Sequence, residues 1–356
     1  MRKLLLMAIV PVLLAAGYGA YLYIAAGQCR DVPRAFAGTC TAVDGIPGPE
    51  DIEFLPTDAG AGLAIISSDD RRAAARGAPV PGALYLYGTT TGRLENLTPA
   101  AGNAFHPHGL SVARGRDGGL YVFVVNHPGR GEDANERHEI MVFRLSAGRR
   151  LEHLRTLRDA SVTAPNDVFA LDDERFYVTN DHGLNGILRK VEDYGRLPFS
   201  NLVYFDGRGY RRVAEGFRYA SGVAVSDKGD KLFVAAAIDR AVFVFDRDPL
   251  SGALGNRRRI DMGMGADNLN RDEAGALWVA GHPKLLSFVA HASDARRKAP
   301  SEVYRLMPDG RGGYRKERVF SDDGTLFSAS SVAAVQGRRL LIGTPFDNRF
   351  LDCRLP

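Results

Sequence analysis

Two histidines stand in short motifs whose side chains could activate water for hydrolysis. His108 lies in a His-Pro-His-Gly motif at residues 106–109, and His127 lies in an Asn-His-Pro motif at residues 126–128. A histidine with a pKa near neutrality can take a proton from water, and a second histidine can hold the first in a suitable tautomer. If the two motifs open and close one β-hairpin, both side chains lie at the same edge. We therefore predict that His108 and His127 form the catalytic dyad of a hydrolase.

The motif around His108 belongs to a repeat. Six triplets, each a polar residue, a small or polar residue and an aliphatic residue, open an apolar run that a second apolar run follows after a turn. Successive triplets start 46 to 63 residues apart, a period that is typical of a propeller blade of about four strands. We predict an all-β fold, a six-bladed β-propeller; two β-sandwiches with accidental similarity are the alternative. The triplets start at Glu50, His108, Asn166, Ser221, Asp267 and Ser330.

Three of these triplets carry paired oxygen ligands. In a propeller the first strand of each blade lines the central channel, so residues that open those strands converge at one end of the axis. Carboxylate and amide oxygens select calcium, whereas zinc prefers nitrogen and sulfur. Without a cation, converging carboxylates would repel one another. We predict one calcium site or two, although any single pair could be a solvated turn. The residues are Glu50, Asp51, Asn166, Asp167, Asp267 and Asn268.

The remaining histidines are expected in three kinds of position. His182 and His282 end second strands of the third and fifth repeats, so they either line the same pocket or make structural hydrogen bonds at blade corners. His106 is expected in the channel or a turn. Surface positions are expected for His138, His153 and His291. No Gly-x-Ser-x-Gly motif and no glycine-rich phosphate loop is present, which disfavours a serine nucleophile.

The N-terminal 28 residues predict a transmembrane or signal-anchor helix. After Met1-Arg2-Lys3, residues 4–27 carry no charge, and at about 1.5 Å per residue this run is long enough to cross a bilayer. A cleaved signal peptide is the alternative. In both cases the body lies outside the cytosol, anchored to the membrane or secreted, and in the periplasm if the source is bacterial.

Residues 29–356 are expected to form the propeller hydrolase domain. An oxidising compartment permits Cys40 to pair with Cys353, which would join the chain ends where too few residues remain for a complete last blade. Free thiols are the alternative. Residues 189–210 interrupt the repeat and form either an ordinary outer strand or a wall of the active site. The net charge of +4, without a basic stripe and interleaved aromatic residues, argues against nucleic-acid binding.

Several motifs together resemble the paraoxonase/arylesterase family over about residues 40–353. The resemblance implies a six-bladed calcium propeller with a hydrophobic N-terminus and a terminal disulfide, which hydrolyses lactones, aryl esters and, weakly, organophosphate triesters. Its partners would be a small ester or lactone and, through the N-terminal segment, a membrane. The motifs lie at residues 50–56, 106–109, 124–128, 166–168, 179–182, 213–217 and 277–279.

The resemblance also implies roles for individual residues, and these divide the oxygen ligands into two sets. His108 and His127 match the histidine dyad of the family. Ser221 stands where the family typically has an asparagine ligand, and its hydroxyl is shorter. The catalytic calcium would be held by Glu50, Asn166, Asp267 and Asn268, and a structural calcium by Asp51, Asp167 and the carbonyl oxygen of Leu110.

Two other functions fit the same residues. One is a propeller hydrolase of the gluconolactonase type, acting on sugar lactones with the same metal. The other is a noncatalytic binding module that keeps calcium for stability alone, which the substitution at Ser221 would favour. A panel of substrates, tested with and without calcium, separates the three.

Overall fold

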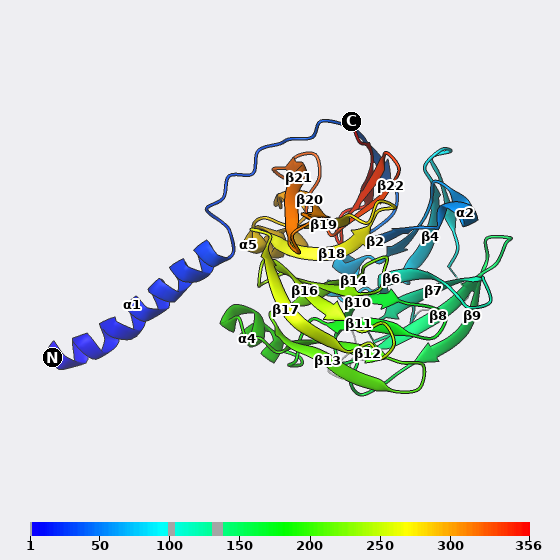
Figure 1. Cartoon of the computed structure of the whole chain (residues 1–356). Helices are drawn as coiled ribbons and strands as arrows, with labels where there is room; N and C mark the ends of the chain where they lie inside the picture. The colour runs from blue at the N-terminus through cyan, green and yellow to red at the C-terminus, as the bar shows by residue number, and fades with distance from the viewer. Residues whose placement is uncertain (1, 99–103, 130–137) are drawn as a thin grey trace.

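The chain forms a ring of six four-stranded antiparallel sheets, as the computed structural model in Figure 1 shows. The structure describes residues 2–98, 104–129 and 138–356. The predicted six-bladed β-propeller is therefore confirmed. The first three blades are β2 (Pro49–Phe54), β3 (Leu63–Ser68), β4 (Ala83–Gly88) and β5 (Arg93–Asn96); β6 (Pro107–Arg114), β7 (Leu120–Asn126), β8 (Glu139–Leu145) and β9 (Leu151–Leu157); and β10 (Pro165–Ala170), β11 (Phe176–Asn180), β12 (Ser200–Phe205) and β13 (Tyr210–Phe217).

The other three blades follow the same order until the chain closes on itself. They are β14 (Ala220–Val225), β15 (Lys231–Ala236), β16 (Ala241–Arg247) and β17 (Leu254–Asp261); β18 (Gly265–Arg271), β19 (Leu277–His282), β20 (Ser301–Pro308) and β21 (Tyr314–Asp322); and β22 (Val332–Gln336), β23 (Arg339–Gly343), β24 (Arg349–Arg354) and β1 (Thr39–Asp44). In this last blade β1 pairs with β24 in the order β22-β23-β24-β1, so the N-terminal strand supplies the outer strand.

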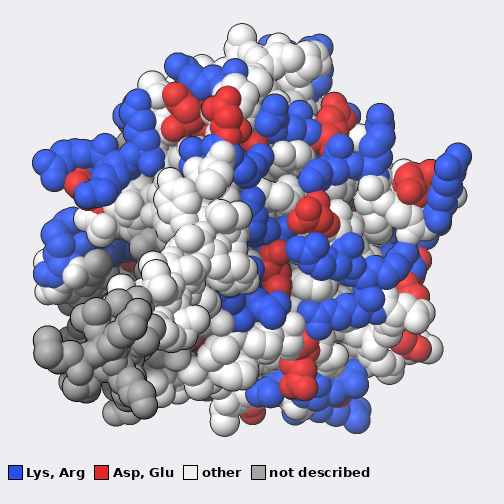
Figure 2. Space-filling model, turned by 90° about the vertical axis from the view of Figure 1, so that its left-hand side faces the viewer, with Lys and Arg blue, Asp and Glu red and all other residues white. Residues whose placement is uncertain are grey.

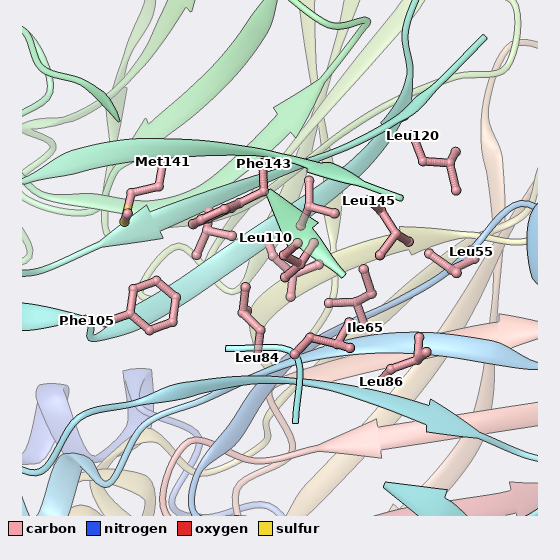
Figure 3. Close-up of a cluster of buried hydrophobic side chains, with 14 residues drawn as sticks. Leu55, Ile65, Leu84, Leu86, Phe105, Leu110, Leu120, Met141, Phe143 and Leu145 are labelled. Carbon is pink, nitrogen blue, oxygen red and sulfur yellow. The ribbon is translucent and has the colours of Figure 1, made fainter. Parts of the chain in front are cut away.

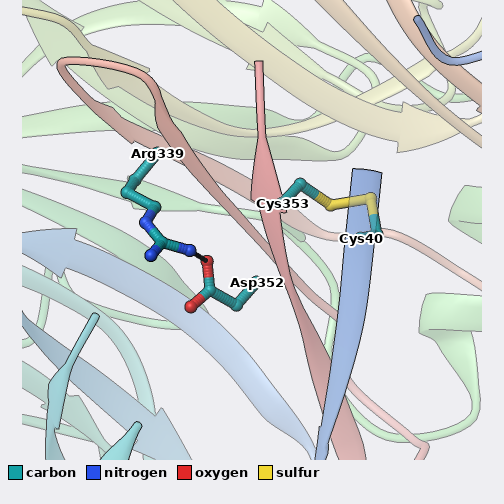
Figure 4. The surroundings of a disulfide bond; sticks show 4 residues. All are labelled: Cys40, Arg339, Asp352 and Cys353. Atoms are coloured by element: carbon teal, nitrogen blue, oxygen red, sulfur yellow. Dashed lines mark hydrogen bonds and ion pairs between the residues drawn. A yellow bond between two sulfur atoms is a disulfide. The ribbon is translucent and has the colours of Figure 1, made fainter. Parts of the chain in front are cut away.

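A disulfide joins the two ends of the ring at this seam. Cys40 and Cys353 are directly paired residues of β1 and β24, and their sulfur atoms are bonded (Figure 4). The predicted pairing is confirmed. The bond spans 313 residues of sequence. Closing a loop of this length in the unfolded chain corresponds to about 6 kcal/mol of stability in the chain-entropy treatment.

Apolar residues pack between neighbouring blades. Because each blade has a neighbour on both faces, its middle strands are buried throughout, and every residue of β7 is buried. Leu84 of the first blade and Phe143 of the second belong to one such cluster between the two sheets (Figure 3). The sheets are therefore rigid walls that hold the innermost strands in place.

The innermost strands carry the predicted triplets at register shifts. Five of the six inner strands, β2, β6, β10, β14 and β18, lose regular pairing with their neighbours at these residues. Such a bulge leaves residues unpaired in the ladder and turns their side chains away from the usual alternation. The triplet side chains can therefore point toward the central axis of the propeller.

Among the residues that the structure describes, five helices lie outside the blades: α1 (Arg2–Ala25), α2 (Thr57–Gly60), α3 (Arg71–Ala75), α4 (Leu188–Gly195) and α5 (Leu285–Ser293). In Figure 1, α1 projects from the side of the ring where α4 and α5 lie. Its end is held there, because the carbonyl of Ala26 accepts a hydrogen bond from the backbone N–H of Leu285 at 2.9 Å.

No helix in the described part of the chain is long and apolar enough to cross a membrane. The predicted transmembrane or signal-anchor helix is therefore not confirmed. The division of the chain at residue 28 stays a prediction.

Candidate active site

A cavity of about 780 Å³ lies at one end of the central axis of the propeller and brings together seven of the predicted site residues. They come from four blades, and most stand at the opening of an inner strand or at the end of a second strand. The seven are Glu50, His108, His127, Asn166, His182, Asp267 and His282.

The two histidines of the predicted dyad are in contact. Nδ1 of His108 lies 3.0 Å from Nε2 of His127, within hydrogen-bond distance. Pairing of Pro107 with Asn126 in the β6–β7 hairpin places the two side chains at one edge. The other ring nitrogen of His108, Nε2, lies 3.8 Å from a carboxylate oxygen of Glu50. The hairpin interpretation of the sequence is confirmed, and the catalytic roles stay predictions.

Two buried amides present oxygens suited to a cation. Nδ2 of Asn166 donates to Asp181 at 3.2 Å, and Nδ2 of Asn268 donates to Glu50 at 2.8 Å. The Oδ1 atom of each amide is buried and has no hydrogen-bond partner within the described residues. A buried polar atom without a partner lowers the stability of the fold, and a bound calcium ion would provide a partner for each of these oxygens.

The predicted oxygen ligands line two different cavities. Glu50, Asn166 and Asp267 line the large cavity, whereas Asp51, Asp167 and Leu110 line a second cavity of about 90 Å³. No group of three acidic, histidine or cysteine side chains that could hold a metal occurs in the part of the chain that the structure describes. Amide and carbonyl oxygens would therefore have to complete either site.

Burial opposes ionisation of the carboxylates in the smaller cavity. It raises the pKa of Asp51 well above its ordinary value, and the charge of Glu50 adds to this rise. Burial likewise raises the pKa of Asp167, with a further contribution from Asp51. Backbone N–H groups of Leu110 and Val223 donate to the two carboxylates at 2.7 and 2.8 Å, which offsets only part of the cost. A cation between them would allow both to ionise.

Ser221 is fully buried near the large cavity but does not line it. Its hydroxyl donates to the carbonyl of Ala266 at 3.0 Å, which leaves the lone pairs of the oxygen to face elsewhere. The role of Ser221 as a ligand stays a prediction.

His182 and His282 have both of the roles that the sequence left open. Each lines the cavity, and each is tied to a carboxylate. His282 Nε2 lies 2.9 Å from Asp267, and its ring stacks on Phe288 with centroids 3.8 Å apart. His182 lies between Asp181, at 2.7 Å, and Asp193 of α4, at 3.0 Å.

His182 joins α4 to the ring through its contacts with Asp181 and Asp193. Burial lowers the pKa of His182, but the charges and hydrogen bonds of Asp181 and Asp193 outweigh that effect and raise it to about 10. Of residues 189–210, those in α4 help to line the cavity, and β12 is the third strand of its blade. Both interpretations of this stretch are correct for different parts of it.

Two histidines expected at the surface lie elsewhere. His138 lines the cavity, and its Nδ1 lies 2.9 Å from Nδ1 of His127. His291 is buried and paired with Asp347 at 2.9 Å, since α5 folds back onto the ring. His153 is exposed as expected, and His106 is buried against Asp69. The position of His138 follows from the pairing of β7 with β8, because the pair Asn126–Glu139 places residues 127 and 138 opposite one another.

Apolar side chains help to line the cavity. Leu22 and Ala26 at the end of α1, Tyr194 of α4 and Leu286 of α5 are among the lining residues. Further apolar residues of α1 and α4 are exposed. Figure 2 shows a band of uncharged surface on the side toward which α1 projects, bordered by lysine and arginine. The cavity therefore favours substrates with an apolar part.

Comparison with known proteins identifies relatives across nearly the whole chain. The profile of the Arylesterase family matches residues 37–355. Serum paraoxonase/arylesterase 1 of Homo sapiens is 31% identical, covering 92% of this chain and 91% of its own. Serum paraoxonase/arylesterase 2 of Gallus gallus is 32% identical with the same coverage.

Solved structures with lower sequence identity share the fold. A gluconolactonase from Xanthomonas campestris superimposes with a TM-score of 0.54 at 16% identity, covering 92% of this chain and 96% of that one. The calcium-binding protein regucalcin from Agrobacterium tumefaciens has a TM-score of 0.56 at 13% identity, covering 91% of this chain and 98% of that one.

Proposed function

The chain belongs to the arylesterase family, and on this premise we propose that it is a calcium-dependent hydrolase of lactones and aryl esters, with weak activity on organophosphate triesters. The observation that carries the proposal is the contact between His108 and His127 in the cavity that Glu50, Asn166 and Asp267 also line. A base and a set of hard oxygen ligands then face the same substrate.

Two calcium ions are proposed, one for each cavity. Glu50, Asn166, Asp267 and Asn268 would hold the catalytic ion, with Ser221 as a further neutral ligand. Asp51, Asp167 and the carbonyl of Leu110 would hold the structural ion. Calcium bound in the large cavity supplies a Lewis acid that polarises the carbonyl of the substrate and stabilises the oxyanion. The amide oxygens of Asn166 and Asn268 support this assignment, because both are buried without another partner among the described residues.

The histidine dyad supplies the base. When Nδ1–H of His108 donates to Nε2 of His127, Nε2 of His108 is the atom that takes a proton from the attacking water. The carboxylate of Glu50 lies 3.8 Å from that nitrogen and favours the imidazolium that forms. His282 holds Asp267 through a 2.9 Å contact and so orients a ligand of the catalytic ion.

The test is hydrolysis of phenyl acetate, aliphatic lactones, gluconolactone and an organophosphate triester, with calcium, after chelation and after calcium is restored. We expect turnover of aryl ester and lactone that disappears on chelation and returns with calcium. His108→Gln should lower kcat about 10²- to 10⁴-fold, whereas His153→Gln, at an exposed position of the same blade, should not. Activity that survives complete calcium removal contradicts the proposal. Turnover of gluconolactone alone would favour a sugar lactonase, and calcium-dependent stability without any turnover would favour a binding module.

We also propose that the protein works outside the cytosol with the mouth of its cavity facing a membrane. The disulfide supports an oxidising compartment. The exposed apolar residues of α1 and α4, which include Leu14 and Val191, support contact with acyl chains, since other residues of both helices line the cavity. Co-sedimentation with phosphatidylcholine vesicles tests this, with Val191→Asp as the variant and Val80→Asp, an exposed apolar position outside these helices, as the control. Equal sedimentation of the two variants would contradict it.

A further inference from the structure

A third histidine extends the dyad. His138 contacts His127 through the ring nitrogen opposite the one that faces His108: Nδ1 of His127 lies 2.9 Å from Nδ1 of His138, and Nε2 of His127 lies 3.0 Å from Nδ1 of His108. The rings of His127 and His138 are nearly perpendicular, at 89°, with centroids 5.0 Å apart. All three rings line the same cavity. The histidines therefore form a chain of three rather than a pair.

The backbone holds His138 in this position. Asn126, the last residue of β7, pairs with Glu139, the first residue of β8. A side-chain hydrogen bond of 2.7 Å from Asn126 to Glu139 reinforces the pair. The next residues outward, His127 and His138, then lie opposite one another across the two strands. His127 is also fixed by its backbone N–H, which donates to the carbonyl of His106 at 3.1 Å.

The tautomers of the three rings depend on one another. For His108 to take a proton at Nε2, its Nδ1 must carry a hydrogen and donate to Nε2 of His127. A neutral His127 that accepts at Nε2 carries its own hydrogen on Nδ1, and that hydrogen needs an acceptor. Nδ1 of His138 lies where this acceptor must be. The opposite tautomer of His127 would place a hydrogen on Nε2 and leave Nδ1 of His108 as an acceptor.

We propose that His138 is a positioning residue of the hydrolase: by accepting from Nδ1–H of His127 it selects the tautomer in which His108 can act as the base. This role rests on the proposed function, because a noncatalytic propeller has no need of a base. His138 acts through His127, as the third member of a catalytic triad orients the second.

Two substitutions separate positioning from packing. In His138→Leu the acceptor is lost and bulk is largely kept, so kcat should fall about 10- to 100-fold, less than for loss of the base itself, while KM changes little. In His138→Asn, Oδ1 can accept from His127, so kcat should return to within about threefold of the unchanged protein. His153→Leu in the same blade is the control and should behave as the unchanged protein.

The ¹⁵N spectrum of the histidines provides a readout that does not need turnover. We expect the hydrogen of neutral His127 on Nδ1 in the unchanged protein and in His138→Asn, and redistributed toward Nε2 in His138→Leu. If the protein hydrolyses none of the substrates, the proposed function fails while this spectrum still tests the tautomer. Equal losses of kcat in the Leu and Asn variants, or an unaltered His127 spectrum in His138→Leu, would overturn the role of His138.

Discussion

Replacement of His182 by glutamine should destabilise the protein in a manner that depends on pH. His182 lies between Asp181 and Asp193 and its pKa is raised to about 10 from an ordinary 6.5. Because the folded pKa exceeds the unfolded one, the stabilisation is fully present below about pH 6.5 and is lost as pH rises through 10. The difference between the two pKa values corresponds to at most about 5 kcal/mol, falling to about 3 kcal/mol at pH 8 and below about 1 kcal/mol at pH 10.

The measurement is the guanidinium midpoint of the unchanged protein and of His182→Gln at pH 6.5, 8 and 10, with calcium in excess. We expect a large gap between the two midpoints at pH 6.5 that nearly closes at pH 10. Asp193→Asn should show a smaller gap with the same pH dependence, since Asp193 is one-third exposed at its side chain and only one of two partners. His153→Gln is the matched control. A gap that is constant from pH 6.5 to 10 would mean that His182 packs as a neutral ring, and the ionic anchor of α4 would be refuted.

Three further changes test the metal sites and the seam. Glu50→Gln should weaken calcium binding about 10- to 100-fold, measured by calorimetry, because it removes a ligand charge; unchanged affinity would remove Glu50 from the site. Ser221→Ala should weaken calcium binding less than Asn166→Ala does, since Asn166 lines the large cavity and its buried amide oxygen has no partner among the described residues, whereas the Ser221 hydroxyl donates to the carbonyl of Ala266. The reverse order would make Ser221 the stronger ligand. Cys40→Ser should lower the unfolding free energy by up to about 6 kcal/mol, seen as a lower guanidinium midpoint that reducing agent no longer shifts; a midpoint equal to that of the oxidised protein would contradict the stabilising role of the seam.

The repeat explains why so much of the fold followed from sequence. Each blade must bury both faces of its middle strands and expose a polar residue at the axis, so apolar runs and polar triplets recur with the blade period. The sulfur atoms of Cys40 and Cys353 meet at the seam, where the sequence predicted that the chain ends join. The sequence pattern did not predict α4, and seven of its eight residues fall within residues 189–210, which were interpreted as a strand or a wall.

The sequence by itself determined the blades and the contact of His108 with His127, because both follow from local periodicity and hairpin geometry. The tertiary structure supplies the physical reason for the division of the predicted ligands between two cavities: bulges in the inner strands direct adjacent side chains such as Glu50 and Asp51 into different spaces. It also decided the position of His138, which lies opposite His127 beyond the paired ends of β7 and β8. Hydrophobic periodicity does not specify the register between two strands. The sequence pattern alone therefore did not place His138 beside His127, whereas the register of β7 and β8 does.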